Sequence, residues 1–578
     1  MRAELIWSRR KPLILNQQMA LDKMDWQKNL LIAAMIAVLF MLVIRWNDFQ
    51  ENLPDSQAPV ASSTTEGSGF DTPDQSASDI PSLPANEDVP AEPNQAPTPT
   101  NQTIKVFTDS LQLEISTLGG DITSVALPRH YAELNTPDVP FVLLDNRNNH
   151  TYVAQSGLIG ANGTDSAAGR PTFSAIQREY RMADDQDSLI VDLVYQQGEV
   201  SITKRFTFTR EEYLVKVEYL INNQSDTAWS ANLYGQIKRD GQNFHKVSAL
   251  EMNPFLGAAI TTLDENYKKL SFDDLSEKDF KTTRDGGWVA MVQHYFISAW
   301  IPAAQQQNTY HLRKVAGQDL YLLGFTSQRV EVAPGSEGSL QAQFYAGPKD
   351  TERLEEISPY LDLTVDYGWL WWIAKPLFWL LKFIHSFVGN WGLAIIGLTI
   401  LVKAAFFKLS ATSYRSMAKM RKLAPKMQDL KERCGDDRQK MSQEMMKLYK
   451  EEKVNPLGGC LPILVQMPVF LALYWTLMES VELRHSPFFF WIQDLSVKDP
   501  FFVLPLIMGL TMFIQMKLNP TPPDPMQARV MQLMPIVFTF MFLWFPAGLV
   551  LYWVTNNTLG ILQQWLITRQ IESADKKA

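Results

Sequence analysis

Residues 390–409, NWGLAIIGLTILVKAAFFKL, form an apolar stretch about one bilayer crossing long that carries a lysine well inside it. At about 1.5 Å per helical residue, Lys403 lies roughly 20 Å in from Asn390, within a hydrocarbon core of about 30 Å. A charge at that depth costs about 2.5–3.5 kcal/mol, so such a residue normally faces a protein interior or a wet cavity. The alternative interpretation is that Lys403 reaches the near interface beside Lys408 and only marks the edge of the span.

Five other apolar runs predict further membrane crossings. The first, Leu30–Ile44, is flanked by Lys28 and Arg45 and has no small-x-small cleavage site after it, so we expect an uncleaved anchor rather than a signal peptide. The sequence therefore predicts a membrane α-helical protein with six transmembrane helices, one anchor plus a five-helix core. The later crossings are Leu461–Ser480, Phe501–Met516, Val530–Phe545 and Gly548–Ile567.

The distribution of charge predicts which side of the membrane each part occupies. Residues 47–103 contain ten acidic residues and no Lys or Arg, whereas 408–453 contain thirteen basic and seven acidic residues; the net charge of the whole chain is −9. Cytoplasmic loops carry an excess of Lys and Arg. Six spans with a cytoplasmic N-terminus place 408–453 and the C-terminus in the cytoplasm and 47–366 on the opposite side. Cys434 and Cys460 then lie on or near the reducing side.

The polar N-terminal half is predicted to hold a linker and a β domain. Residues 1–23 are unlike the rest and are either a start-site artefact or a short cytoplasmic extension before the anchor, 24–46. Residues 47–103 are rich in Pro, Ser and acidic side chains and nearly free of aromatics, which predicts a disordered acidic linker. From 104 to 347 the hydrophobic period changes to two, which predicts one large antiparallel β-sandwich.

Alternation is clearest in one strand of this region, where apolar side chains at every second position predict a buried face. These residues are Tyr213, Val215, Val217, Tyr219 and Ile221. The histidines of the same region are scattered without metal-ligand spacing, so we expect ordinary surface or core residues and no metal: His130, His150, His245, His294 and His311.

Residues 348–389 are predicted to connect the β domain to the membrane core. Glu352–Asp366 is polar and is expected to be helical in part. Gly368–Val388 is apolar but interrupted by Lys375-Pro376, Lys382 and His385 among many Trp and Phe. This composition favours an amphipathic helix lying in the membrane interface over one that crosses it.

The five-span core, 390–567, includes a predicted cytoplasmic helical hairpin at 411–453 and is followed by the tail 568–578. Met-rich helix faces adapt to varied apolar partners, which predicts contact with a hydrophobic nascent chain. The alternative is that the two helices bury these faces against each other; both hold if the hairpin packs loosely and opens. The methionines at helical spacing are Met417, Met420, Met427, Met441 and Met445.

Several polar side chains lie within the predicted crossings. Thr399 is one turn before Lys403 on the same helix face, and Gln466 precedes Met467-Pro468 in the third span. Such groups either form interhelical hydrogen bonds worth about 0.6–2 kcal/mol each or line a wetted cavity. Since no acidic residue within the crossings pairs with Lys403, we favour a hydrophilic groove open to the cytoplasm. Further amides are Gln515, Asn556, Asn557, Gln563 and Gln564.

Motifs for catalysis and energy coupling are missing from the sequence. It contains no G-x-x-x-x-G-K-[ST], H-E-x-x-H or G-x-S-x-G motif and no chain of acids within the crossings. We therefore expect no enzyme activity and no cofactor. Two other classes of protein stay open: a secondary transporter, although no repeat relates two halves of the bundle, and a membrane-anchored carbohydrate-binding protein, which would place the function in the β domain.

Two C-terminal motifs carry a family resemblance. NPLGGCLPILVQMP at Asn455–Pro468 and FPAGLVLYW at Phe545–Trp553 closely resemble the YidC membrane-protein insertase family. The layout of one anchor span, a large periplasmic domain and a five-span core is also similar. The resemblance implies a protein of a Gram-negative inner membrane, with both termini cytoplasmic and a periplasmic super-sandwich domain resembling sugar-mutarotase folds.

The resemblance also implies a mechanism and a set of groove residues. A positively charged hydrophilic groove, open to cytoplasm and lipid, receives polar parts of a nascent chain. The groove charge of the family is commonly arginine, and the aligned residue here is Lys403. By the same comparison, Met467 and Pro468 in the third span and Tyr552 and Trp553 in the sixth flank the passing substrate helix.

The partners implied are nascent integral membrane proteins, the Sec translocon with its accessory subunits, and the phospholipid bilayer. Many relatives hold the ribosome with a longer basic tail, whereas this chain ends in Asp575-Lys-Lys-Ala. Ribosome contact through the tail is therefore expected to be weak, and no direct contact with nucleic acid is expected.

Overall fold

The computed structural model describes most of the chain after the linker. The predicted extension 1–23, the anchor 24–46, nearly all of the linker 47–103 and the first six residues of the Asn455–Pro468 motif lie outside the described residues. The described residues are 79–81, 102–147, 150–166, 169–243, 254–435, 437–452, 454, 461–519 and 525–575.

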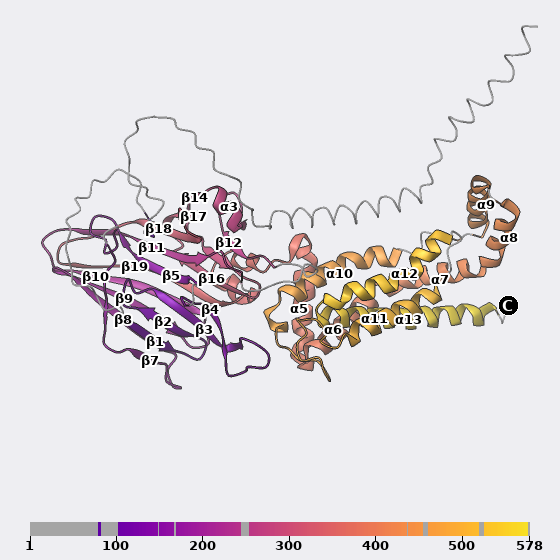
Figure 1. Ribbon diagram of the computed structural model, residues 1–578, viewed down its shortest axis with the longest axis horizontal. Coiled ribbons are helices and arrows are strands. Elements are labelled where there is room, and N and C mark those ends of the chain that lie inside the picture. Colours follow the sequence, from indigo (N-terminus) through magenta and orange to yellow (C-terminus); the bar gives the residue numbers. More distant parts are fainter. Residues whose placement is uncertain are drawn as a thin grey trace, which may run out of the picture. The chain divides into compact units, whose positions relative to one another are not determined.

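Two large β-sheets pack against each other in the N-terminal half, as Figure 1 shows. The ten-stranded sheet has the spatial order β14 (Phe280–Asp285), β17 (Gln307–Lys314), β18 (Leu320–Val332), β11 (Trp229–Asp240), β5 (Tyr152–Ile159), β3 (Ile122–Tyr131), β2 (Gln112–Ser116), β1 (Thr103–Phe107) and β7 (Glu179–Arg181), with β4 (Pro140–Leu144) paired to β3. The nine-stranded sheet has the order β13 (Lys268–Leu270), β12 (Gly257–Ile260), β15 (Val289–Val292), β16 (Phe296–Pro302), β19 (Ser336–Pro348), β10 (Leu214–Asn223), β9 (Val200–Thr209), β8 (Ser188–Gln197) and β6 (Ser174–Ala175).

The predicted β-sandwich is confirmed, and the alternating pattern explains its core. In β10, Val215, Val217, Tyr219 and Ile221 are all buried, while the residues between them are at least partly exposed. Side chains of a strand point alternately to its two faces, so one face of each sheet is buried between the layers. The strand pairing differs from the prediction at one edge, where β1 pairs with β7 in parallel. Every other pairing between named strands is antiparallel within the described residues.

The C-terminal half of the described chain is helical (Figure 1). Its α-helices are α4 (Thr351–Ile357), α5 (Trp371–Val388), α6 (Trp391–Ala405), α7 (Phe407–Lys422), α8 (Ala424–Cys434), α9 (Arg438–Glu451), α10 (Leu461–Glu479), α11 (Val503–Leu518), α12 (Pro525–Met541) and α13 (Ala547–Asp575). A further short helix, α3 (Phe272–Glu277), belongs to the β domain, and single 3-10 turns occur at η2 (Leu361–Thr364), η3 (Gly368–Leu370), η5 (Val481–Leu483) and η6 (Phe542–Trp544).

Each crossing predicted after the anchor overlaps a helix, namely α6, α10, α11, α12 or α13, but the predicted crossing 390–409 is interrupted at Phe406, where α6 ends and α7 begins. By length and composition, no single helix among the described residues qualifies alone as a membrane span. The helices α6 and α7 qualify as a pair, bent by 68° where they meet. The number of crossings therefore stays a prediction, whereas the β-sandwich followed by C-terminal helices is what the structure shows.

Gly389 and Asn390 determine where α5 ends and α6 begins. Gly389 adopts the left-handed conformation with φ of +64°, which ends α5. Asn390 then caps α6, because its side-chain oxygen accepts a hydrogen bond of 3.0 Å from the amide of Leu393. α5 itself exposes an aromatic surface that includes Trp372, Trp379 and Phe387, which is the composition predicted for the interfacial helix.

A buried ion pair ties the end of the β domain to α10. The Lys349 ammonium, directly after β19, lies 2.6 Å from a carboxylate oxygen of Glu479, and both side chains are almost completely buried. Lys349 also donates a hydrogen bond of 3.4 Å to the carbonyl of Thr364. A buried pair is weak evidence of net stability, but removing one partner leaves an uncompensated charge in the interior.

We expect the Lys349→Met variant to be strongly destabilised, by about 3–5 kcal/mol, because the Glu479 carboxylate is left buried without its partner. The double variant Lys349→Met/Glu479→Leu should recover most of the loss. The measurement is thermal unfolding of the purified full-length protein in detergent. Lys426→Met is the matched control, because Lys426 pairs with Glu452 at 2.6 Å on the surface and should matter little. A double variant as unstable as the single one would contradict this account.

Burial of a histidine in the β domain makes stability depend on pH. Burial, with help from the Arg484 cation, lowers the pKa of His130 to about 4, from an ordinary value near 6.5. The unfolded chain then binds a proton that the folded chain does not, so stability falls as pH drops from about 6.5 to about 4. We expect a loss of about 3 kcal/mol at most over this window.

The expected result is that the apparent Tm of the wild type declines more steeply between pH 7 and pH 4.5 than that of His130→Phe. The phenylalanine keeps the packing of the His130 ring, whose centroid lies 5.3 Å from that of Phe296, and removes the titrating group. Parallel Tm curves for the two proteins would show that protonation of His130 contributes nothing.

Candidate functional site

Lys403 lies in the last turn of α6, and its side chain is half-buried. The neighbouring residues Ile400 and Leu401 are each 47% exposed, so one face of α6 is open to its surroundings. The Lys403 ammonium points the other way, into the space between α6 and α13. No described carboxylate forms an ion pair with it.

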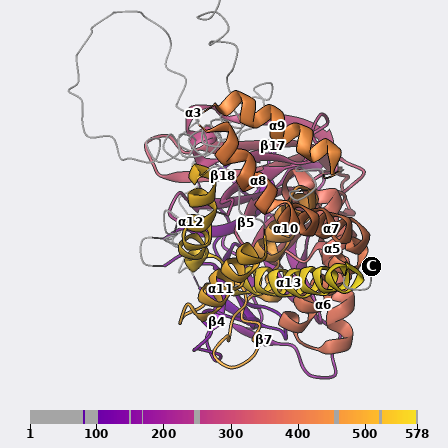
Figure 2. The ribbon, with the colours of Figure 1, turned by 90° about the vertical axis from the view of Figure 1, so that its right-hand side faces the viewer.

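Polar groups from three helices meet at Gly560 of a fourth, α13. A Cβ atom added to this glycine would lie 3.4 Å from the Gln515 Nε2, 3.4 Å from the Tyr414 hydroxyl and 3.6 Å from the Lys403 Nζ. Lys403 comes from α6, Tyr414 from α7 and Gln515 from α11. These three helices pack on α13, as Figure 2 shows from the end of the bundle. Because Gly560 has no side chain, the ammonium, the phenol and the amide can converge beside its backbone.

The chemistry of this cluster suits an anion. A lysine ammonium has three donors and no acceptor, a tyrosine hydroxyl can donate or accept, and an amide nitrogen donates. A carboxylate brought to Gly560 could accept a hydrogen bond from each of the three groups. Among the described residues, no group of three or more His, Cys, Asp or Glu side chains could hold a metal ion.

Other polar residues of the helices are occupied by bonds within the bundle. Thr399 is buried, and its hydroxyl donates a hydrogen bond of 2.7 Å to the carbonyl of Ile395 in the same helix. The Asn557 amide donates to the Thr511 hydroxyl at 3.2 Å, which links α13 to α11. Gln563 and Gln564 donate to backbone carbonyls of Phe407 and Leu518. These contacts correspond to the interpretation that polar residues stabilise the bundle.

The residues expected to flank a substrate lie on α10 and α13. Met467 is 50% exposed, and Gln466 and Pro468 beside it are half-buried. Tyr552 is buried and Trp553 is half-buried; Phe470 of α10 lies between the two helices, with its ring centroid 6.2 Å from that of Tyr552 and 4.6 Å from that of Trp553. The indole N–H of Trp553 is buried and has no hydrogen-bond partner in the described part of the chain.

The methionines of the predicted hairpin divide between two small clusters. Met417 is buried with Tyr414 and Ala411 of α7 against Ile567 of α13. The second cluster joins the end of α7 and α8 to α9, in line with the packed-hairpin alternative: Leu423, Met427 and Val454 are buried, with Met420, Met445, Leu448 and Tyr449 packed against them. Met441 is half-buried. The helix break at Leu423 assigns Met417 and Met420 to α7, whereas the predicted hairpin placed them with Met427 on one helix.

Sequence reasoning missed Tyr414 and Gly560 and treated Gln515 only as one of several amides. On a straight helix, the backbones of Lys403 and Tyr414 would lie roughly 16 Å apart, and nothing in the sequence indicates that the side chains end at one point. A small residue in an apolar helix is a signal for close helix packing, which could have drawn attention to Gly560.

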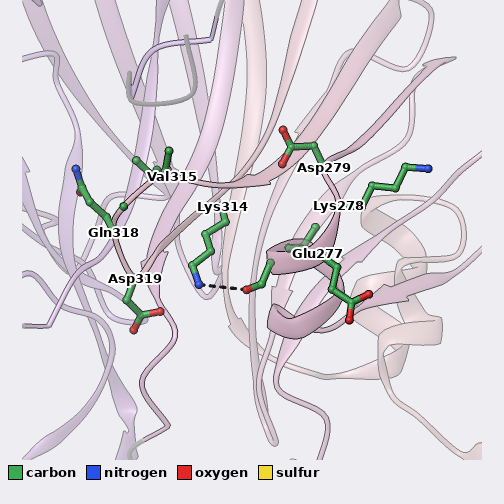
Figure 3. A pocket seen from close by; sticks show the side chains of 11 residues that line it. Glu277, Lys278, Asp279, Lys314, Val315, Gln318 and Asp319 are labelled. Carbon is green, nitrogen blue, oxygen red and sulfur yellow. Dashed lines mark hydrogen bonds between the residues drawn. The ribbon is translucent and has the colours of Figure 1, made fainter. Parts of the chain in front are cut away.

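The β domain has a surface hollow of about 740 Å³ between α3 and the turn that joins β17 to β18. Figure 3 shows that its wall carries charged side chains of both signs, including Glu277, Lys278 and Asp319. The Lys314 ammonium donates a hydrogen bond of 3.2 Å to the Ser276 hydroxyl. Mixed charges of this kind on an open surface do not specify a ligand.

Two family models together match most of the chain. The model described as YidC periplasmic domain matches residues 103–380, and the model described as 60Kd inner membrane protein matches residues 383–575. The chain is 69% identical over 558 residues to the membrane protein insertase YidC of Cellvibrio japonicus (strain Ueda107), an alignment that covers 96% of this chain and 100% of the relative.

A second relative, the membrane protein insertase YidC of Saccharophagus degradans (strain 2-40 / ATCC 43961 / DSM 17024), is 56% identical over 559 residues, with 95% of this chain and 100% of the relative covered. Among solved structures, the one titled "Active YidC insertase crystal structure with the first transmembrane domain resolved" is 17% identical, with a TM-score of 0.36, and the match covers 80% of this chain and 92% of that chain.

Proposed function

The chain belongs to the YidC family of membrane protein insertases, and on this basis we propose that the polar cluster at Gly560 is the point where it receives the polar flank of a substrate. Members of this family are insertases and not enzymes. The family predicted from the two C-terminal motifs is therefore confirmed. A transporter or carbohydrate-binding function has no support from the relatives.

One observation carries the proposal: a half-buried ammonium, without a described carboxylate partner, shares the space beside Gly560 with an amide and a phenol. A lone cation in an apolar bundle costs about 2.5–3.5 kcal/mol unless water or a ligand reaches it. We infer that the space at Gly560 is wet and forms part of a groove open to the cytoplasm. In this account Thr399 and Gln466 shape the groove, although the Thr399 hydroxyl is bonded to its own helix.

The insertion step follows from the cost of moving polar groups through hydrocarbon. A carboxylate crossing the bilayer loses its hydration, and a cation placed partway offers it a partner. Lys403 attracts acidic residues of the translocated tail, and the hydrophobic segment of the substrate then leaves between α10 and α13 into lipid. Burial of apolar surface at about 25 cal/mol per Å² drives this release.

The side chains along the proposed exit fit an apolar passenger. Met467 is half exposed, and a flexible thioether side chain adapts to varied partners. The buried indole N–H of Trp553 lacks a partner among the described residues and can donate to a passing chain once α10 and α13 separate. Tyr552 is buried, so its contact with a substrate requires α10 and α13 to separate.

We propose the following topology and partners. Six crossings place both termini and the α8–α9 hairpin in the cytoplasm, with the β domain in the periplasm, and the hairpin meets the nascent chain first. Because Met427 and Met445 pack between α8 and α9, the hairpin must open for these two side chains to bind a substrate. The Sec translocon and the ribosome are proposed as partners from the family resemblance alone.

We expect Lys403→Ala to insert substrates with acidic translocated tails roughly fivefold more slowly, as loss of an ion pair worth about 1 kcal/mol implies. Substrates with neutral tails should be inserted almost normally. The measurement is protease protection of newly synthesised substrates in vesicles containing the purified variant. Lys403→Arg should retain activity because it keeps the charge, and the exposed Lys408→Ala serves as the matched control. Equal insertion of acidic and neutral tails by Lys403→Ala would refute the role of the charge.

The glycine gives a second test that leaves the lysine in place. Gly560→Leu should fill the space beside the Lys403 ammonium and reduce insertion of acidic-tail substrates as Lys403→Ala does. Gly560→Ala should have little effect, because its Cβ meets its neighbours at 3.4–3.6 Å, close to ordinary contact distances. The same vesicle assay provides the comparison, with thermal unfolding as a check on folding. Wild-type rates in a folded Gly560→Leu protein would show that substrates do not use this space.

A further inference from the structure

A short segment of the predicted acidic linker lies on the outer face of the ten-stranded sheet. Among the linker residues before Gln102, Asp79, Ile80 and Pro81 are the described ones. The Asp79 carboxylate forms an ion pair with the Lys238 ammonium of β11, and the Asp79 carbonyl accepts a hydrogen bond of 2.6 Å from the Gln236 amide. Pro81 is buried. Two side chains of one strand therefore hold both the side chain and the backbone of a single linker residue.

The register of the sheet explains why these side chains lie together. Gln236 and Lys238 are two residues apart in β11, so both point to the same face. That face is opposite to the one buried between the sheets, since Ile237 between them belongs to the core. Lys238 is paired with Leu322 of β18, which is paired with Arg313 of β17. Arg313 is thus in the same row of the sheet, two strands from Lys238.

The site that holds Asp79 has two cations nearby, Lys238 and Arg313. Burial lowers the pKa of Arg313, and the carboxylates of Asp279 and Asp79 oppose that lowering. Lys238 is ion-paired with Asp79, and the Arg313 cation is near enough to feel the charge of both Asp279 and Asp79, while the linker as a whole carries ten acidic residues and no basic ones. The Lys238 side chain is 17% exposed and the Asp79 side chain 43% exposed, so their attraction is screened less than that of a fully exposed pair.

The amide that binds the Asp79 carbonyl is held in one orientation. The Gln236 Nε2 also donates to the Gln155 side-chain oxygen at 2.9 Å, and the Gln155 amide donates to Asp121 at 2.9 Å. Gly324 lies beside Gln236 in the next strand, where an added Cβ would come within 2.6 Å of the Gln236 Cβ. The missing side chain leaves room for the Gln236 amide, which is therefore preorganised for a backbone carbonyl.

We propose that this face of β11, β18 and β17 is a binding site for Asp79–Pro81, and that the segment acts as a strap between the linker and the β domain. The site recognises a carboxylate through Lys238, with the Arg313 cation nearby, a backbone carbonyl through Gln236, and a proline by burial. The strap leaves thirty-two residues, 47–78, between the predicted anchor and the docking point, instead of the fifty-six residues 47–102 that precede β1. It thereby restricts how far the β domain can move from the anchor helix.

Photocrosslinking in the full-length protein tests the strap directly. A benzophenone amino acid at position 80 should crosslink to peptides of β11, β17 or β18, and the same probe at position 60 of the linker should not. Asp79→Lys and Lys238→Glu should each lower the yield at position 80 roughly fivefold, as loss of a part-buried ion pair implies. The charge-swapped double variant should restore most of the yield. Asp74→Lys, with the same change of charge elsewhere in the linker, is the matched control.

The outcomes are distinct. Unchanged yield in both single variants, or equal yields at positions 60 and 80 of the wild type, would overturn the proposal. Hydrogen exchange of β11 gives a second measurement that does not depend on the probe: Asp79→Lys should raise exchange there. Unchanged protection of β11 in Asp79→Lys would mean that another part of the chain, or a partner, covers this face, and would also overturn the strap. Insertase activity enters neither measurement, so failure here leaves the groove proposal unaffected.

Discussion

The free-energy cost of placing one ammonium in an apolar helix is the constraint on which the proposed site depends. Lys403 is placed in an otherwise apolar helix, and the free energy of keeping it charged there depends on what surrounds it. The bundle brings an amide, a phenol and a bare glycine backbone to the same point, but no described carboxylate. A built-in acid would neutralise the cation and remove its capacity to attract a substrate. The proposed insertase mechanism requires that the Lys403 charge has no fixed partner within the bundle.

The backbone around Lys403 helps to bring the polar groups together at Gly560. The Asn390 cap determines where α6 begins, and the 68° bend after it redirects the chain so that α7 carries Tyr414 to α13. Polar residues of α13 on either side of Gly560 are bonded to α11 and to α7, which holds these helices together around Gly560. The same type of residue thus has two roles in one bundle: the amides of α13 stabilise the helix packing, and Gln515 of α11 lies near Gly560 with the cation.

The β domain follows a different physical rule. Its core is formed by alternating apolar residues of two sheets, and its functional features are electrostatic contacts at the margins. The pair formed by Lys349 and Glu479 joins the domain to α10, and Asp79 joins it to the linker. The β domain is thus held at two places by ion pairs between residues far apart in the chain.

Much of this protein could be read from its sequence, because the features concerned are local. The spacing of apolar residues predicted the β-sandwich and the C-terminal helices, and the motif Phe545–Trp553 was one of two that identified the family. The sequence also singled out Lys403, since a charge within an apolar run needs no tertiary information to be noticed. It did not predict that Tyr414 and Gly560 belong to the same site, that Thr399 is bonded to its own helix, or that Asp79 contacts β11. Those facts depend on distances between residues far apart in the chain. A bend between two helices and the register of paired strands set these distances, and both result from packing over the whole fold.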